Sequence, residues 1–405
     1  MDGARTRGQP SALEAVRAMV GGRTPHAVLL TGPAGVGKTT LALDLAAGLL
    51  CTPASGQTRP CRACRACRMV DHGNHPDLHW LRPEGAGGQV VIGGPDAKHR
   101  GVRDLVADLA LLPVEGGARV AIVERADRMN DDAQTALLKT LEEPPAGVTI
   151  VLCADEEERL LPTVRSRCAR VRLGPVAARG VEAVLAEHDA ADPPTAARLG
   201  RLAGGRPGLA LAYARAPGAV TIRAEISRAL LDLLDARPSA RLEALRGLVP
   251  RAADLVAALD EAAEPRPAHG AEASAPRIDG RGRGRGRSKA AVPAESEPPG
   301  DVEAGDDVAR RVPAAERRRG AAVLIGIWTD VARDLSLVRI GERSALRDPG
   351  LLEELEAVAR DLPPSAISGF LELLSTAARQ LEANVAPELL LDSLVLGWPT
   401  RPRAA

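Results

Sequence analysis

The chain has 405 residues, enough for two or three domains of roughly 100–200 residues each. Its 53 basic and 53 acidic residues cancel, which excludes a strong positive field over the whole protein but leaves room for a local basic patch. Hydrophobic residues make up 45% of the chain, yet there are only 3 Trp, 1 Tyr and 1 Phe, so the cores must be built from Leu, Val and Ala. This composition favours helices and buried parallel strands.

The N-terminal residues 1–11 are polar and lack the apolar core of a signal peptide. No apolar run approaches the ~18–20 residues that cross a bilayer. We therefore expect a cytoplasmic protein with no membrane partner. In that compartment the 6 cysteines are poor candidates for structural disulfides.

Strand and helix patterns alternate up to about residue 173. Short apolar runs predict buried strands at 27–30, 120–123 and 149–152. Helical spacing predicts helices over 39–50 and 131–143, and Pro144-Pro145 stops the second one. This alternation predicts an α/β domain over residues 1–175, with a parallel sheet covered by helices on both faces.

Strand patterns disappear after residue 175. Residues 176–261 predict short amphipathic helices. Residues 262–315 contain no Leu, Met or aromatic residue and predict a disordered linker. The alternating Arg and Gly at 281–287 could contact nucleic-acid phosphate or simply be solvated within this linker. Helical periodicity returns over 316–405, with an apolar stripe at Leu371, Leu374, Ala378, Leu381 and Val385.

A phosphate-binding pattern follows the first predicted strand. The pattern G-x-x-x-x-G-K-[ST] is matched by Gly32, Pro33, Ala34, Gly35, Val36, Gly37, Lys38 and Thr39, and we count Thr40 in the same site. Glycines let backbone N–H groups curl around phosphate oxygens at the positive end of the next helix. Lys38 would contact the β- and γ-phosphates and the Thr39 hydroxyl would bind Mg²⁺. The motif predicts binding of ATP or ADP with Mg²⁺.

Hydrolysis needs further groups at the ends of two more strands. Glu124 follows the second predicted strand and could organise Mg²⁺. Arg125 occupies the place of the general base and cannot accept a proton, because the pKa of arginine lies above ~12. The third strand ends in Ala154-Asp155, where such ATPases usually place Thr or Asn to orient water. We predict little or no intrinsic ATPase activity.

Four cysteines cluster just after the phosphate-loop helix. Cys51, Cys61, Cys64 and Cys67 have the spacing C-x9-C-x2-C-x2-C. Four thiolates suit tetrahedral Zn²⁺ and leave no open coordination position, so we predict a structural zinc site. An iron–sulfur cluster is an alternative that nothing else in the sequence favours. The nearby histidines could replace a ligand, but the simpler interpretation of His72, His75 and His79 is that they lie on the surface or pack behind the ligands.

These motifs together resemble the bacterial DNA polymerase III clamp-loader family, and within it the delta-prime subunits. The resemblance is carried by L-L-K-x-L-E-E-P-P at 137–145, by L-P-T-V-R-S-R-C at 161–168 and by the cysteine cluster at 51–67. It extends over residues 8 to about 260. It implies an AAA+ nucleotide-binding domain at 1–175, a small helical lid at 176–261 and a helical collar domain at 316–405.

The resemblance also implies partners and a role for Arg167. That residue would be an arginine finger acting in trans on a neighbour's γ-phosphate. The implied partners are the gamma/tau motor subunits, delta, the sliding clamp and primed DNA, which would be contacted through its phosphates. Motor subunits carry Asp-Glu where this chain has Glu124-Arg125, and a lid arginine where it has Gly208. These differences favour a non-motor subunit.

Two other functions remain as alternatives. The chain could be an active gamma/tau-like ATPase, which Arg125 argues against. It could also be a zinc-dependent DNA-binding protein on an AAA+ scaffold, which the balanced charge argues against. A small-molecule kinase with a phosphate loop is disfavoured by the S-R-C motif.

Overall fold

The computed structural model describes residues 3–22, 24–54, 57–83, 89–94, 99–115, 117–263, 314–383 and 385–401. The linker predicted at 262–315, with its Arg–Gly repeat, lies almost entirely outside the described residues. None of the helices in these ranges is long and apolar enough to cross a membrane.

A parallel sheet forms the centre of the N-terminal domain. Within the described residues it has five strands in the order β2-β3-β4-β1-β5. All neighbouring strands pair in parallel, so β1 lies between β4 and β5. The strands are β1 (Ala27–Thr31), β2 (Leu78–Leu81), β3 (Arg119–Val123), β4 (Val148–Ala154) and β5 (Ala169–Arg172).

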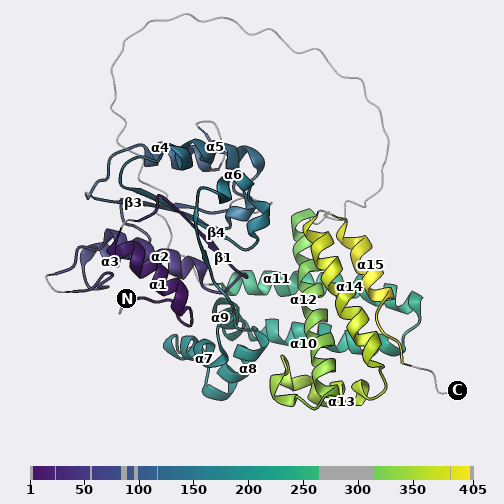
Figure 1. Ribbon diagram of the computed structural model, residues 1–405. Coiled ribbons are helices and arrows are strands. Elements are labelled where there is room, and N and C mark those ends of the chain that lie inside the picture. Colours follow the sequence, from purple (N-terminus) through teal and green to yellow (C-terminus); the bar gives the residue numbers. More distant parts are fainter. Residues whose placement is uncertain are drawn as a thin grey trace, which may run out of the picture. The chain divides into compact units, whose positions relative to one another are not determined.

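Helices cover both faces of this sheet (Figure 1). Val28 and Leu30 pack with the helices of one face, and Ala27 and Leu29 with those of the other. Successive side chains of a strand point to opposite faces, so a continuous apolar run fits a strand buried on both sides. One face carries α1 (Pro10–Gly21), α2 (Lys38–Leu50) and α3 (Arg65–Asp71); the other carries α4 (Val102–Leu109), α5 (Asp131–Glu142) and α6 (Pro162–Arg165).

The predicted α/β architecture is therefore confirmed. The strands expected at 27–30, 120–123 and 149–152 correspond to β1, β3 and β4, and the expected helices to α2 and α5. Strands β2 and β5 had not been predicted.

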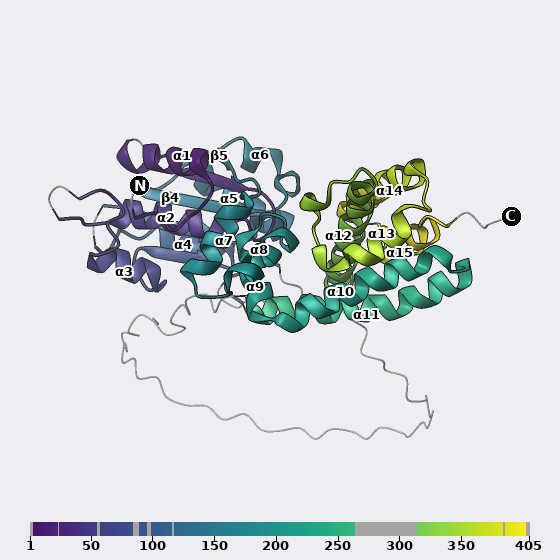
Figure 2. The same cartoon turned by 90° about the horizontal axis from the view of Figure 1, so that it is seen from below.

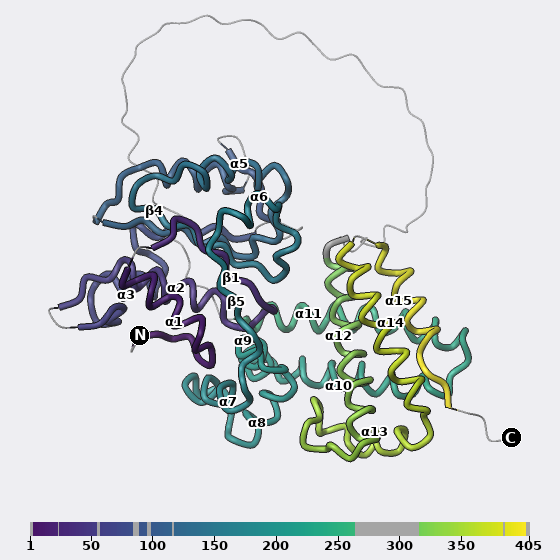
Figure 3. The backbone as a smooth tube through the Cα atoms, in the orientation of Figure 1, coloured from purple at the N-terminus to yellow at the C-terminus, as the bar shows by residue number. Residues whose placement is uncertain are grey.

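The rest of the described chain is helical. Helices α10 and α11 run side by side (Figure 2) and pack against α9 as well as α12. Helices α14 and α15 lie alongside α12 (Figure 3). The elements are α7 (Ala178–Glu187), α8 (Pro193–Leu202), α9 (Pro207–Arg215), α10 (Pro217–Asp232), α11 (Pro238–Ala262), α12 (Ala314–Arg339), α13 (Leu352–Ala359), α14 (Pro364–Glu382) and α15 (Pro387–Leu396). The domain limits at 175, 261 and 316 stay predictions.

The apolar stripe predicted for the C-terminal region needs a correction. Leu374 and Leu381 are buried in α14 as expected, but Val385 lies beyond its end and is exposed. The buried positions are Ile367, Phe370, Leu374, Ala377 and Leu381. The predicted Leu371 and Ala378 are partly buried beside this face.

Candidate functional site

The predicted phosphate loop connects the carboxyl end of β1 to the start of α2. Gly32, Gly35 and Gly37 adopt φ values of 145°, 78° and 107°, a region that side chains strongly disfavour. A Cβ atom on Gly32 would lie 2.2 Å from the carbonyl oxygen of Leu173. The loop therefore needs its glycines. Pro33, Ala34 and Gly35 are exposed, and Val36 anchors the turn in the core.

Lys38 is largely enclosed and already has three partners. Its Nζ donates to the carbonyl oxygens of Gly32 at 2.6 Å and Pro33 at 2.9 Å. The same Nζ lies 2.6 Å from a carboxylate oxygen of Asp155, and only 8% of the lysine side chain is exposed. The charge that would attract a phosphate thus faces a carboxylate of the same chain.

Arg125 and Asp127 hold that carboxylate in place. Arg125 Nη2 lies 2.9 Å from the second oxygen of Asp155. The backbone N–H of Asp155 donates to the Asp127 side chain at 3.0 Å. Burial, and then the negative charge of Asp155, raise the pKa of the Asp127 carboxyl. Arg125, expected only to replace the general base, is therefore also a clamp on Asp155.

The other predicted nucleotide ligands gather at the same edge of the sheet. Glu124 follows β3 and is buried, with its carboxylate 3.8 Å from Arg82 Nε. Thr39 and Thr40 lie half-buried in the first turn of α2. The buried thiol of Cys153 feels the charges of Glu124, Lys38, Asp155 and Asp127, although burial is the main cause of its raised pKa. The structure thus brings these groups together.

Helix α9 reaches the loop through its backbone. The N–H of Gly208 donates to the carbonyl oxygen of Gly35 at 2.8 Å. A Cβ on Gly208 would lie 3.1 Å from that oxygen, so glycine allows the close approach. Arg206 donates from Nε to the carbonyl of Ala203 at 2.8 Å. Gly208, where motor subunits carry an arginine, is thus a contact point for the phosphate loop.

The four clustered cysteines converge as predicted. The ligand atoms of Cys51, Cys61, Cys64 and Cys67 all lie within 4.8 Å of one another, and none forms a disulfide. Tetrahedral Zn–S bonds of about 2.3 Å would place sulfur atoms about 3.8 Å apart. The observed Sγ–Sγ distances of 3.5 Å for Cys51–Cys61 and 3.9 Å for Cys51–Cys64 fit that geometry. The donor set and its spacing therefore suit zinc.

Backbone N–H groups point at these sulfurs. Those of Cys61, Cys64 and Cys67 each donate to the preceding cysteine sulfur at 3.4 Å. Burial raises the pKa of the Cys64 thiol, but hydrogen bonds from the Cys67 and Thr52 backbones and from neighbouring thiols outweigh it and lower the pKa to about 6. Burial raises the pKa of Cys67. The cluster therefore stabilises the thiolate form of Cys64, which is only partly buried.

The three histidines near the cluster are not part of it. His75 Nδ1 accepts the backbone N–H of Asp77 at 3.1 Å, and its Nε2 lies 3.5 Å from Glu115. His79 faces Asp108 at 3.5 Å, and His72 is exposed at the end of α3. The surface interpretation fits His72, whereas His75 is buried against a carboxylate.

Asp44, in the second half of α2, was not anticipated from the sequence. It is completely buried and accepts the backbone N–H groups of Arg5 and Thr6, both at 2.9 Å. Arg62, within the cysteine segment, forms ion pairs with both Asp44 and Asp71. These contacts fasten the N-terminal segment and the cysteine segment to α2.

Arg167 lies on the surface between α6 and β5. About a third of its side chain, 34%, is exposed. Its Nη2 lies 2.6 Å from Glu142, the last residue of α5, and its Nη1 donates to the carbonyl of Thr163 at 2.9 Å. The S-R-C and E-E-P-P motifs are thus joined by one exposed ion pair.

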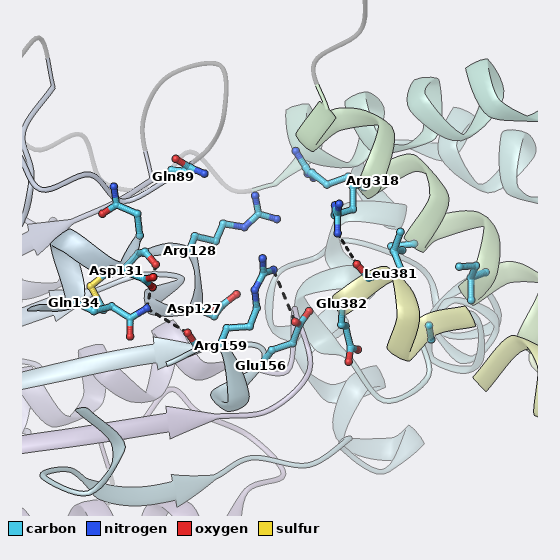
Figure 4. Close-up of a pocket in the computed structure, with 16 residues that line it drawn as sticks. Gln89, Asp127, Arg128, Asp131, Gln134, Glu156, Arg159, Arg318, Leu381 and Glu382 are labelled. Carbon is cyan, nitrogen blue, oxygen red and sulfur yellow. Dashed lines mark hydrogen bonds and ion pairs between the residues drawn. The ribbon is translucent and has the colours of Figure 1, made fainter. Parts of the chain in front are cut away.

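A buried glutamine positions this segment. Gln134 of α5 donates from Nε2 to the carbonyls of Met129 and Arg159, both at 3.2 Å (Figure 4). Its Oε1 accepts the N–H of Leu161 at 2.7 Å. The start of α6, and with it Arg167, is therefore fixed to α5 by hydrogen bonds that no sequence motif announced.

The phosphate loop at the carboxyl end of a parallel sheet, with helices on both faces, defines a P-loop protein. Residues 8–177 match the family described as "DNA polymerase III, delta subunit". The chain is 39% identical over 161 residues to DNA polymerase III subunit delta' of Pseudomonas aeruginosa, covering 39% of this chain and 46% of that protein.

Two further relatives point the same way. Subunit delta' of Escherichia coli is 36% identical over 191 residues, covering 47% of this chain and 55% of the relative. Subunit tau of Salmonella typhimurium is 32% identical over 222 residues, covering 53% of this chain and 33% of tau. The chain thus matches about half the length of these delta-prime relatives. Over residues 8–177 the chain is therefore similar to delta-type subunits of DNA polymerase III.

Proposed function

We propose that the chain is a non-motor subunit of the DNA polymerase III clamp loader. It joins the gamma/tau motor subunits and delta, supplies Arg167 to a neighbour's nucleotide site and helps to place the sliding clamp on primed DNA. The observation that carries this proposal is the position of Arg167 relative to the chain's own phosphate loop.

These two features lie at opposite ends of neighbouring parallel strands. The phosphate loop follows Thr31, which pairs with Arg172, whereas Arg167 precedes Ala169, which pairs with Val28. At ~3.3 Å per residue the two levels are about 10 Å apart, before the loops at either end add to the separation. This supports a role in trans, because Arg167 lies at the edge of the sheet opposite the chain's own phosphate loop.

The pairing of Arg167 with Glu142 also suits this role. Exposed ion pairs are weak, with typical values of about 0–1 kcal/mol. A guanidinium that leaves such a carboxylate for a triphosphate keeps charge-assisted hydrogen bonds and gains a partner of higher negative charge. Glu142 would therefore keep Arg167 in place until a neighbour's nucleotide arrives.

Nucleotide binding and zinc binding belong to the same proposal. Backbone N–H groups of residues 32–37, Lys38, Thr39 and Thr40 would hold ATP or ADP, and Glu124 would help to hold Mg²⁺. Hydrolysis by the lone chain would be slow, because Arg125 cannot act as a base and is paired with Asp155. Cys51, Cys61, Cys64 and Cys67 would hold a zinc ion that stabilises the end of α2.

The test is ATP turnover by an assembly reconstituted from gamma/tau, delta and this chain. Arg167→Ala should lower turnover by a factor of ~10³ or more at the affected site while the subunits still co-purify. Arg170→Ala is the matched control, because Arg170 is another exposed arginine a few residues away. Unchanged turnover by an intact assembly carrying Arg167→Ala would refute the proposed role.

A further inference from the structure

A carboxylate at the end of β4 lies beside the phosphate loop and pairs with the lysine that would contact a phosphate. Asp155 presents one oxygen to Lys38 at 2.6 Å and the other to Arg125 at 2.9 Å. Only 17% of its side chain is exposed. Its own N–H is held by Asp127 at 3.0 Å, so both the backbone and the carboxylate are fixed.

Both cations beside the loop are therefore already matched by a negative charge. A carboxylate and a phosphate oxygen offer similar acceptors to an ammonium group, so they compete for Lys38. Solvent would screen the repulsion between the Asp155 carboxylate and a bound phosphate only weakly, because the side chains of Lys38 and Asp155 are mostly buried.

The two kinds of nucleotide differ in how much they need Lys38. In phosphate loops the backbone N–H groups cradle the α- and β-phosphates, and the lysine reaches the β- and γ-phosphates. A diphosphate keeps the backbone cradle and can leave Lys38 with Asp155. A triphosphate brings one more phosphate to the place where the carboxylate already sits.

We infer that Asp155 is a specificity-determining residue that makes this site favour nucleoside diphosphate over triphosphate. The inference rests on the nucleotide binding proposed above. Arg125 contributes by pairing with the Asp155 oxygen that does not face Lys38. The residue at the position of the general base therefore also holds in place the carboxylate that competes with a phosphate. The site would then retain ADP as a structural ligand while neighbouring subunits exchange theirs.

Equilibrium binding of Mg–ADP and Mg–ATP to the purified full chain tests this directly, by calorimetry. Asp155→Asn keeps the size of the side chain and removes its charge, and it should raise ATP affinity about tenfold or more. ADP affinity should rise less than about threefold, since its phosphates lie in the backbone cradle. Asp392→Asn, an exposed change of equal net charge in α15, should alter neither.

Each outcome has a meaning. If the Asp155→Asn variant binds ATP and the wild type does not bind ATP, the inference is supported in its strongest form. An unchanged ATP/ADP affinity ratio overturns it and leaves nucleotide binding intact. If neither nucleotide binds to any variant, both this inference and the proposed nucleotide site are wrong. The proposed role of Arg167 is tested separately by its own turnover assay. Asp155→Ser provides a second variant if Asp155→Asn does not melt like the wild type.

Discussion

The two ends of helix α2 make an instructive comparison. At its first turn Lys38 is held by Asp155 and by two loop carbonyls. At its last residue the chain enters a cluster whose sulfur atoms lie within 4.8 Å of one another. The first site already supplies its own counter-charge, whereas the second gathers four thiols that would repel one another as thiolates.

This difference predicts that a triphosphate at Lys38 exchanges, whereas a metal at the cysteine cluster stays bound. The third phosphate of a triphosphate must displace a carboxylate from Lys38, which weakens triphosphate binding. Zinc relieves the repulsion among thiolates, and structural sites of this kind commonly contribute directly to folding. We therefore expect a loosely held triphosphate at one end of α2 and a permanent metal at the other.

Loss of the metal site should have the largest effect. Cys64→Ser removes one of four ligands and should abolish stoichiometric zinc, lowering the melting temperature by more than ~15 °C. Metal analysis and calorimetry measure both quantities. Cys168→Ser is the control, because that cysteine lies outside the cluster and its thiol donates to the carbonyl of Val164 at 3.3 Å. Full zinc content in Cys64→Ser would contradict the assigned ligand set.

Asp44 should come next, because it links the cysteine segment to α2. Asp44→Asn leaves the Arg62 guanidinium partly unpaired in a buried position, and breaking such a pair typically costs about 3–5 kcal/mol. Chemical denaturation gives this free energy of unfolding. Limited proteolysis should also cut faster within residues 3–9. A loss below about 1 kcal/mol would mean that the contact contributes little.

A smaller loss of stability is expected next to the first turn of α2, in the phosphate loop. Gly32→Ala places a Cβ against the carbonyl of Leu173 at a φ of 145° and should cost about 1–3 kcal/mol. Nucleotide binding should weaken in parallel, because the loop must shift. Gly218→Ala, where a Cβ would meet nothing within 4 Å, is the matched control. Equal stability of the two variants would argue against a tightly constrained loop.

Local patterns predicted the elements whose signals are contained in one segment. Buried strands β1, β3 and β4 are apolar runs, and the phosphate loop and cysteine cluster are motifs of short spacing. Strand β5 reads Ala-Arg-Val-Arg, since an edge strand exposes one face, and four residues are too few for that alternation to stand out. Strand β2 is equally short.

The long-range contacts of the phosphate loop were not predictable in this way. Asp155 meets Lys38 across 117 residues of sequence, as the difference of their numbers shows, and Gly208 meets Gly35 across 173. Such pairs depend on the order of strands and on the path of α9. The polar residues alone suggested a missing catalytic group, and only the fold revealed that Asp155 and Arg125 form a clamp.

The central claim is that this chain serves a neighbour's nucleotide and not its own. ATP turnover should therefore be compared in two otherwise identical reconstituted assemblies, one carrying Lys38→Ala and the other Arg167→Ala. The account predicts near-normal turnover with Lys38→Ala and a large loss with Arg167→Ala, while both assemblies remain intact. A large loss with Lys38→Ala and normal turnover with Arg167→Ala would contradict it.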